Sequence, residues 1–102
     1  MAESNKVLLD LNNPVFQEDL FNLGKEDAIR ILEALKKIKR LTWTDIYKDK
    51  GLCWESVQSR TDPGEQRLYT IRISQRFRAL VYREAQFIRF LSLHPDHDSA
   101  YK

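Results

Sequence analysis

The sequence has little cysteine, glycine and histidine, and its net charge is close to zero. The single cysteine, Cys53, excludes an internal disulfide and a cysteine-based zinc site. Its neighbours Leu52 and Trp54 predict a buried, inert thiol. The three glycines all stand where a helix or a turn is expected to end, so the chain has no glycine-rich phosphate loop. A net charge of +2 identifies no partner by itself.

Long apolar runs are also missing. The first residues, MAESNKVLLDLNN, predict neither a signal peptide nor a transmembrane helix, and we therefore expect a cytoplasmic protein. With 42% apolar and 31% charged residues the chain is typical of a globular protein, and its 102 residues predict one domain over 1–102. There is no internal repeat and no low-complexity segment.

The first half of the chain predicts a short strand and then two helices. KVLLDLN has the pattern of a strand, and Asn13 followed by Pro14 is typical of a helix start. Gly24 is expected to end this first helix. Apolar residues at spacings of three and four predict a second helix over 25–41, with acids at its start and lysines at its end. Its apolar face consists of Ala28, Ile31, Leu32, Leu35, Ile38 and Leu41.

Residues 42–51 can form one short helical turn, capped by Thr44 and Asp45 and stopped by Gly51. Trp43 and Tyr47 in this segment are expected to pack on the core. Beyond it apolar residues recur at every second position, which is typical of strands. The predicted strands are WESVQSR, LYTIRIS, QRFRALVYRE and FIRFLSL, with a turn at 62–64. The expected fold class is α+β, with two N-terminal helices packed on one face of a small antiparallel sheet.

The alternation in the predicted strands separates an apolar face from a basic one. In LYTIRIS, Ile71 and Ile73 share a face, and Arg72 lies on the other. We expect Arg72, Arg76 and Arg78 to line the face without helices. The planar guanidinium group suits phosphate, although a solvated arginine face has the same pattern.

The last residues, SLHPDHDSAYK, hold both histidines and a tyrosine. Two histidines three apart bind one metal best on a helix, but Pro95 lies between them and no third histidine exists, so no metal or other cofactor is expected. An RNA strand can be cleaved by attack of its own 2′-hydroxyl on the neighbouring phosphate. This reaction needs only proton transfer and cations around the phosphate. If the tail folds over the sheet, it can supply these groups; the alternative is a solvent-exposed tail. The set is Arg72, Arg78, His94, His97 and Tyr101.

Residues 66–101 resemble the C-terminal half of the RelE/ParE superfamily of bacterial type II toxins. That half typically reads Y-x-I-R/K, then Y/F-R before an apolar strand, then another apolar strand, a histidine or arginine, and a tyrosine near the end. The matching residues are Tyr69, Ile71 and Arg72, then Phe77 and Arg78, then FIRFLSL. Two helices before the sheet also fit. The resemblance implies a RelE-like α+β toxin domain.

The resemblance also implies a function and partners. It implies an endoribonuclease that cleaves messenger RNA on the ribosome without a metal, and a cognate antitoxin. Arg72 would contact RNA and Arg78 would hold the phosphate. The expected basic face adds Arg76 as a second RNA-binding residue. His94 or His97 would act as acid or charge stabiliser together with Tyr101, and a spacing of four residues to Tyr101 favours His97. The superfamily also includes inhibitors of DNA gyrase. Two alternatives therefore stay open: a ParE-like inhibitor of DNA gyrase, and a degenerate family member that acts as a binding module.

Overall fold

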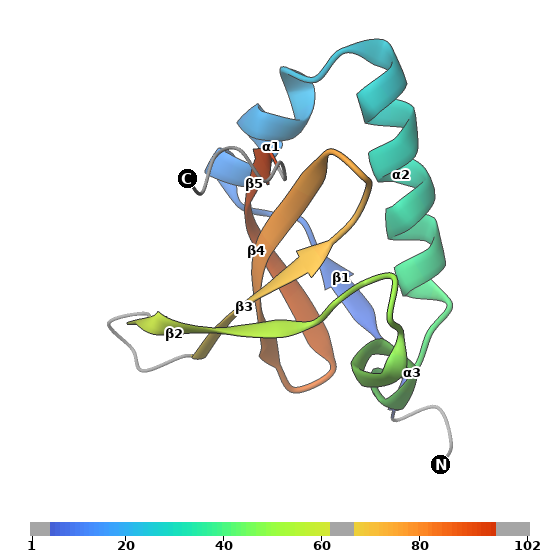
Figure 1. Ribbon diagram of the computed structural model, residues 1–102, viewed down its shortest axis with the longest axis vertical. Coiled ribbons are helices and arrows are strands. Elements are labelled where there is room, and N and C mark those ends of the chain that lie inside the picture. Colours follow the sequence, from blue (N-terminus) through green and yellow to red (C-terminus); the bar gives the residue numbers. More distant parts are fainter. Residues whose placement is uncertain (1–4, 62–66, 96–102) are drawn as a thin grey trace.

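The computed structural model describes residues 5–61 and 67–95, so the turn predicted at 62–64 lies outside the described residues. Figure 1 shows the sheet with α2 and α3 along one side of it. None of the helices in the described ranges is long and apolar enough to cross a membrane. The elements are β1 (Leu8–Asp10), α1 (Pro14–Phe21), α2 (Lys25–Lys39), α3 (Trp43–Lys48), β2 (Glu55–Thr61), β3 (Arg67–Arg72), β4 (Phe77–Glu84) and β5 (Phe87–Pro95).

The start of α1 follows the sequence prediction. The Asn13 side chain accepts hydrogen bonds from the backbone N–H groups of Val15, at 2.8 Å, and Phe16, at 3.3 Å, and Pro14 is the first helical residue. The end of α1 differs. Asn22 is its C-terminal cap, and Gly24, in an extended conformation, is instead the N-terminal cap of α2.

The predicted helix over 25–41 is confirmed as α2, which ends two residues earlier, at Lys39. Beyond the helix the Leu41 carbonyl accepts a hydrogen bond from the Val7 N–H at 3.1 Å. Thr42 then caps α3 in a capping box with Asp45, so the cap is two residues before the predicted Thr44.

The five strands form one sheet in the order β1–β5–β4–β3–β2. The last four pair antiparallel, as predicted, whereas β1 runs parallel to β5, with Leu8 opposite Phe87. The β4–β5 ladder contains a register shift after Leu80, which pairs with Ser92 while Val81 pairs with Phe90. The predicted α+β class, with helices on one face of a small and mainly antiparallel sheet, is confirmed.

The core lies between the helices and one face of the sheet. Ile31, Leu35 and Ile38 of α2 are buried in it. The ring of Phe16 in α1 packs on the ring of Phe90 in β5, with 5.3 Å between the ring centroids. Leu32 was predicted to be on the buried face, but 53% of it is exposed. It lies about 100° around the helix from Ile31, beyond the stripe that the sheet covers.

The prediction that both aromatics of α3 pack on the core is confirmed. Trp43 is fully buried, and Tyr47, although half exposed, packs its ring on Trp43 with 5.7 Å between the ring centroids. Tyr47 lies at the edge of the core, where its hydroxyl accepts a hydrogen bond from Arg83 at 2.8 Å. The Arg83 guanidinium also lies 4.3 Å from the centre of the Trp43 ring.

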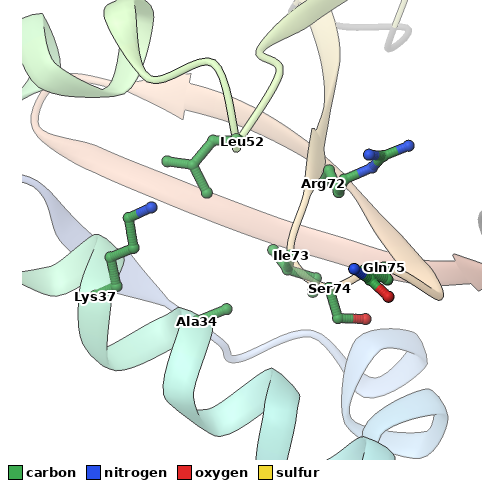
Figure 2. Close-up of a pocket in the computed structure, with 8 residues that line it drawn as sticks. Ala34, Lys37, Leu52, Arg72, Ile73, Ser74 and Gln75 are labelled. Carbon is green, nitrogen blue, oxygen red and sulfur yellow. The ribbon is translucent and has the colours of Figure 1, made fainter.

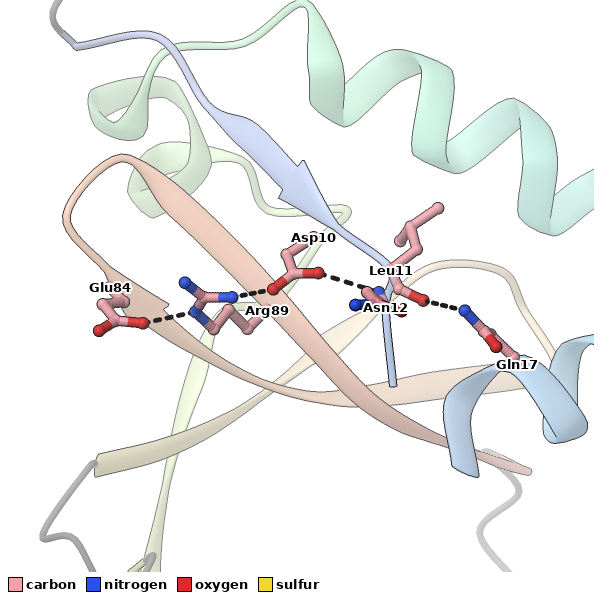
Figure 3. A network of polar contacts seen from close by, with 6 residues as sticks. All are labelled: Asp10, Leu11, Asn12, Gln17, Glu84 and Arg89. Atoms are coloured by element: carbon pink, nitrogen blue, oxygen red, sulfur yellow. Dashed lines mark hydrogen bonds and ion pairs between the residues drawn. The ribbon is translucent and has the colours of Figure 1, made fainter. Parts of the chain in front are cut away.

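An ion-pair network holds the short strand β1 on β5. Figure 3 shows Arg89 of β5 between Asp10 of β1 and Glu84 of β4, with an ion pair to each. Asp10 also accepts a hydrogen bond from the Asn12 N–H at 2.9 Å, and Gln17 of α1 donates to the Leu11 carbonyl at 3.1 Å. β1 has only three residues, and these side-chain contacts add to its backbone pairing with β5.

Arg89→Ala should therefore lower the free energy of unfolding by about 1–3 kcal/mol, because it leaves two carboxylates without their shared partner. Urea unfolding followed by tryptophan fluorescence measures the change. Arg30→Ala, at an exposed position of α2, is the matched control and should unfold like the wild type. Equal unfolding midpoints for the two variants would contradict a role for Arg89 in attaching β1.

Candidate functional site

Three of the predicted site residues form a row across the sheet. Arg72 on β3 is directly opposite Arg78 on β4, and Arg78 is opposite His94 on β5. Residues opposite each other in antiparallel strands have their side chains on the same face. Each of the three residues has a buried neighbour in sequence. These neighbours, Ile71, Ala79 and Leu93, also lie opposite one another and form a second row on the core face of the sheet. The row of Arg72, Arg78 and His94, called the basic row below, therefore lies on the face without helices.

Arg78 is the most enclosed member of the basic row. Only 18% of its side chain is exposed. Its Nη1 donates a hydrogen bond to Thr70 Oγ1 at 3.0 Å and lies 3.7 Å from Glu55 Oε1. Its Nη2 lies 3.9 Å from Cys53 Sγ. Since Thr70 and Glu55 belong to β3 and β2, the guanidinium reaches across the sheet toward the β2 edge.

His94 stands on the other side of Arg78, on β5. Its Nε2 lies 2.8 Å from the hydroxyl oxygen of Ser92, the preceding residue on the same face. The Cα atoms of directly opposite residues in antiparallel strands are about 4.5–5.5 Å apart, so His94 and Arg78 start from neighbouring positions. His94 is exposed to solvent.

Arg76 does not share this face, and that part of the sequence prediction is wrong. It lies in the turn between β3 and β4, and its Nε is 3.7 Å from Asp27 of α2. The turn follows Ser74, whose hydroxyl accepts hydrogen bonds from the N–H groups of Arg76 and Phe77. Side chains alternate between the two faces only within a strand, and this alternation does not continue through such a turn. The prediction placed Arg76 on the face of Arg78 because the two residues are two positions apart.

Cys53 is also placed differently from the prediction. It is partly exposed rather than buried, and its backbone has a φ of 54°. Its thiol donates a hydrogen bond to Glu55 Oε2 at 3.4 Å and faces the Arg78 guanidinium. The position between Leu52 and Trp54 suggested burial, but the left-handed backbone turns this side chain toward the basic row.

The sequence assigned no role to three side chains that touch the basic row: Glu55, Thr70 and Ser92. Thr70 and Ser92 could have been found from the two-residue alternation, since they stand two positions from Arg72 and His94. Glu55 could not, because its place depends on the pairing of β2 with β3. His97 and Tyr101 lie outside the described residues, so their roles and the predicted folding of the tail over the sheet stay predictions.

The arrangement suits a phosphate group with a proton carrier beside it. Two guanidinium groups on one face can donate paired hydrogen bonds to phosphate oxygens, and an imidazole and a carboxylate lie on either side of Arg78. In residues 5–61 and 67–95, no group of three or more His, Cys, Asp or Glu side chains could hold a metal ion.

No protein-family model matches the sequence, and no curated protein sequence matches it. Among solved structures the chain is similar to the crystal structure of the archaeal RelE–RelB complex from Pyrococcus horikoshii OT3. The TM-score is 0.60 at 17% sequence identity, and the match covers 88% of this chain and 94% of that chain. The fold is RelE-like. The predicted resemblance is thus confirmed for the fold.

In this RelE-like fold a pocket of about 320 Å³ lies beside Arg72, between α2, the loop before β2 and the β3–β4 turn. Figure 2 shows the Lys37 ammonium directed toward the loop at Leu52, while the Arg72 guanidinium points away from Lys37. The pocket floor is apolar, formed in part by the buried side chains of Leu52 and Ile73. It extends the surface next to the basic row.

Asp49 holds the loop that brings Cys53 and Glu55 to Arg78. Its carboxylate accepts a hydrogen bond from the Leu52 N–H at 3.0 Å and pairs with Lys37 of α2, also at 3.0 Å. Burial by itself would raise the pKa of Asp49, but the hydrogen bonds from Lys37, Leu52 and Gly51 and the charge of Lys37 together hold this pKa below its ordinary value of 3.8. The charged form of Asp49 therefore stabilises the folded loop.

A carboxyl group whose pKa is lowered by folding contributes stability above its unfolded pKa, and this stability is lost as the pH falls through the folded pKa. Asp49→Asn should lower the free energy of unfolding by about 1 kcal/mol at pH 7, since the Lys37 side chain of this ion pair is 51% exposed. The difference from the wild type should narrow below about pH 4. Urea titrations from pH 7 to pH 3.5 measure it, and a difference that widens toward low pH would contradict this role.

Proposed function

We propose that this chain is a RelE-like toxin of a type II toxin–antitoxin system, and that it cleaves messenger RNA on the ribosome without a metal. The observation that carries the proposal is the basic row on the helix-free face of a RelE-like fold. A phosphate binds best where several charge-assisted hydrogen bonds converge, and Arg78 is held in place for this by Thr70 and Glu55. The similar archaeal structure is a RelE–RelB complex, which supports a cognate antitoxin as the partner here.

The proposed reaction is an internal transesterification. A base takes the proton of the 2′-hydroxyl, the 2′-oxygen attacks the phosphorus, and the bond from phosphorus to the 5′-oxygen breaks. An acid returns a proton to that 5′-oxygen. The products carry a 2′,3′-cyclic phosphate and a 5′-hydroxyl, and Arg78 stabilises the charge that grows on the phosphate in between. His94, His97 and Tyr101 are the candidate proton carriers, and Arg72 is the proposed RNA contact.

The first test uses purified protein and ribosomes programmed with a short messenger RNA. The wild type should cut the message and leave 5′-hydroxyl ends, whereas metal-dependent hydrolysis commonly leaves 5′-phosphates. Arg78→Ala should lower the cleavage rate by about a hundredfold or more, because it removes the donor to the developing charge. Primer extension measures the rate, and a kinase that labels only 5′-hydroxyls identifies the ends.

Arg30→Ala removes the same charge from the exposed side of α2 and should cleave like the wild type. Circular dichroism of both variants separates loss of chemistry from loss of fold. Cleavage by Arg78→Ala at the wild-type rate would refute the assigned role of Arg78. Intact message in the presence of the wild type, together with DNA damage signalling in cells, would instead support the gyrase alternative.

A second test distinguishes the histidines. His94→Ala and His97→Ala should differ sharply, and the variant that loses about a hundredfold in cleavage rate identifies the proton carrier. The position of His94 opposite Arg78 supports His94, and the spacing to Tyr101 supports His97. Single-turnover rates on programmed ribosomes measure both. Wild-type rates in both variants would remove histidine from the mechanism.

A further inference from the structure

His94 belongs to the basic row only because β5 is irregular. Ile88 and Phe90 are fully buried on the core face of this strand. Side chains alternate between the two faces of a regular strand, so the residues two and four positions after Phe90 would lie on the core face as well. Instead Leu93 is buried in the core, and His94 is exposed on the opposite face. The change of face therefore occurs between Phe90 and Leu93.

A β-bulge makes this change of face. Phe90 of β5 pairs with Val81 of β4, and Ser92 pairs with Leu80, the preceding residue of β4. Leu91 is therefore an extra residue in β5, and it shifts the alternation of side chains by one position. The part of the strand beyond the bulge is thereby turned so that its imidazole joins the basic row. Bulges occur often next to active sites, where they re-aim a side chain in this way.

The bulge lies where β5 changes its outer neighbour. Among the residues that the structure describes, β1 pairs with β5 only at 87–89. Helix α1 lies against the next part of β5 (Figure 1), where its Phe16 ring packs on the Phe90 ring. Asp19 follows Phe16 by three residues and so lies on the same face of α1. Its carboxylate accepts a hydrogen bond from the Leu93 N–H at 2.9 Å, which anchors β5 just beyond the bulge.

We propose that Asp19 is a positioning residue, which holds the bulged segment of β5 so that His94 faces Arg78. This inference rests on the proposed ribonuclease function, in which His94 is a candidate proton carrier. Leu93 is buried, so loss of the carboxylate would leave its N–H without this acceptor and allow the bulged segment to shift. A misplacement of about 1 Å at a reacting group can cost about a hundredfold in rate. RNA binding by Arg72 and Arg78 should not depend on Asp19, because these two residues lie on β3 and β4.

Asp19→Ala should lower the single-turnover cleavage rate on programmed ribosomes by about tenfold, because it displaces the imidazole without removing it. Binding to ribosomes whose message has a 2′-deoxy nucleotide at the cleavage position should not change. Asp19→Asn keeps an acceptor oxygen and should restore most of the cleavage rate. Amide exchange followed by NMR gives a readout that is independent of activity. The Leu93 N–H should exchange about tenfold faster in Asp19→Ala than in the wild type or in Asp19→Asn.

A double-mutant comparison separates positioning from general destabilisation. If Asp19 acts through His94, Asp19→Ala should cause no further loss of cleavage in a His94→Ala background. A residue that only stabilises the fold would lower cleavage by the same factor in both backgrounds. Equal losses in the two backgrounds, or tighter or weaker ribosome binding that accounts for the whole effect, would overturn the inference.

Glu18→Ala is the matched control, since it removes a carboxylate from the neighbouring, exposed position of α1. It should change neither the cleavage rate nor the exchange of the Leu93 N–H. If the wild type cleaves and Asp19→Ala cleaves at the same rate, the positioning role fails and the proposed function stands. If the wild type leaves the message intact, the proposed function fails, and the role of Asp19 fails with it.

Discussion

The pairing of β3, β4 and β5 is the constraint on which the rest of the structure depends. The small or apolar side chains of Ile71, Ala79 and Leu93 pack under the helices and fix which residues of the three strands lie opposite one another. A slip of one residue would turn every side chain to the other face of the sheet. Each member of the basic row is next in sequence to one of these buried residues. The strand pairing therefore places all three members together on the opposite face.

The helix-free face balances charge rather than simply accumulating it. Arg78 is largely enclosed, and an enclosed guanidinium without partners would be costly. Thr70, Glu55 and Cys53 approach it from β3 and the β2 edge and meet this need. At the other end of the same sheet, Arg89 is tied to Asp10 and Glu84 and serves the attachment of β1.

Much of the fold could be predicted because its signals are local. The period of 3.6 in α2, the Asn13–Pro14 start of α1 and the two-residue alternation of β3 to β5 all follow from neighbours in sequence. The errors arose at the ends of helices and strands and at the margin of the buried helix face. Gly24 begins α2 instead of ending α1, Leu32 lies beyond the reach of the sheet, and a turn held by Ser74 directs Arg76 to α2.

The sequence by itself determined the fold class, the apolar and basic faces of the central strands, and the placing of Arg72 and Arg78 on one face, because these depend on the period of side chains along a single strand. The tertiary structure alone decided that His94 stands opposite Arg78 and that Glu55, Thr70 and Cys53 surround its guanidinium. These contacts join different strands and loops. Their geometry comes from strand pairing and from a backbone turn at Cys53, which no pattern within one segment records.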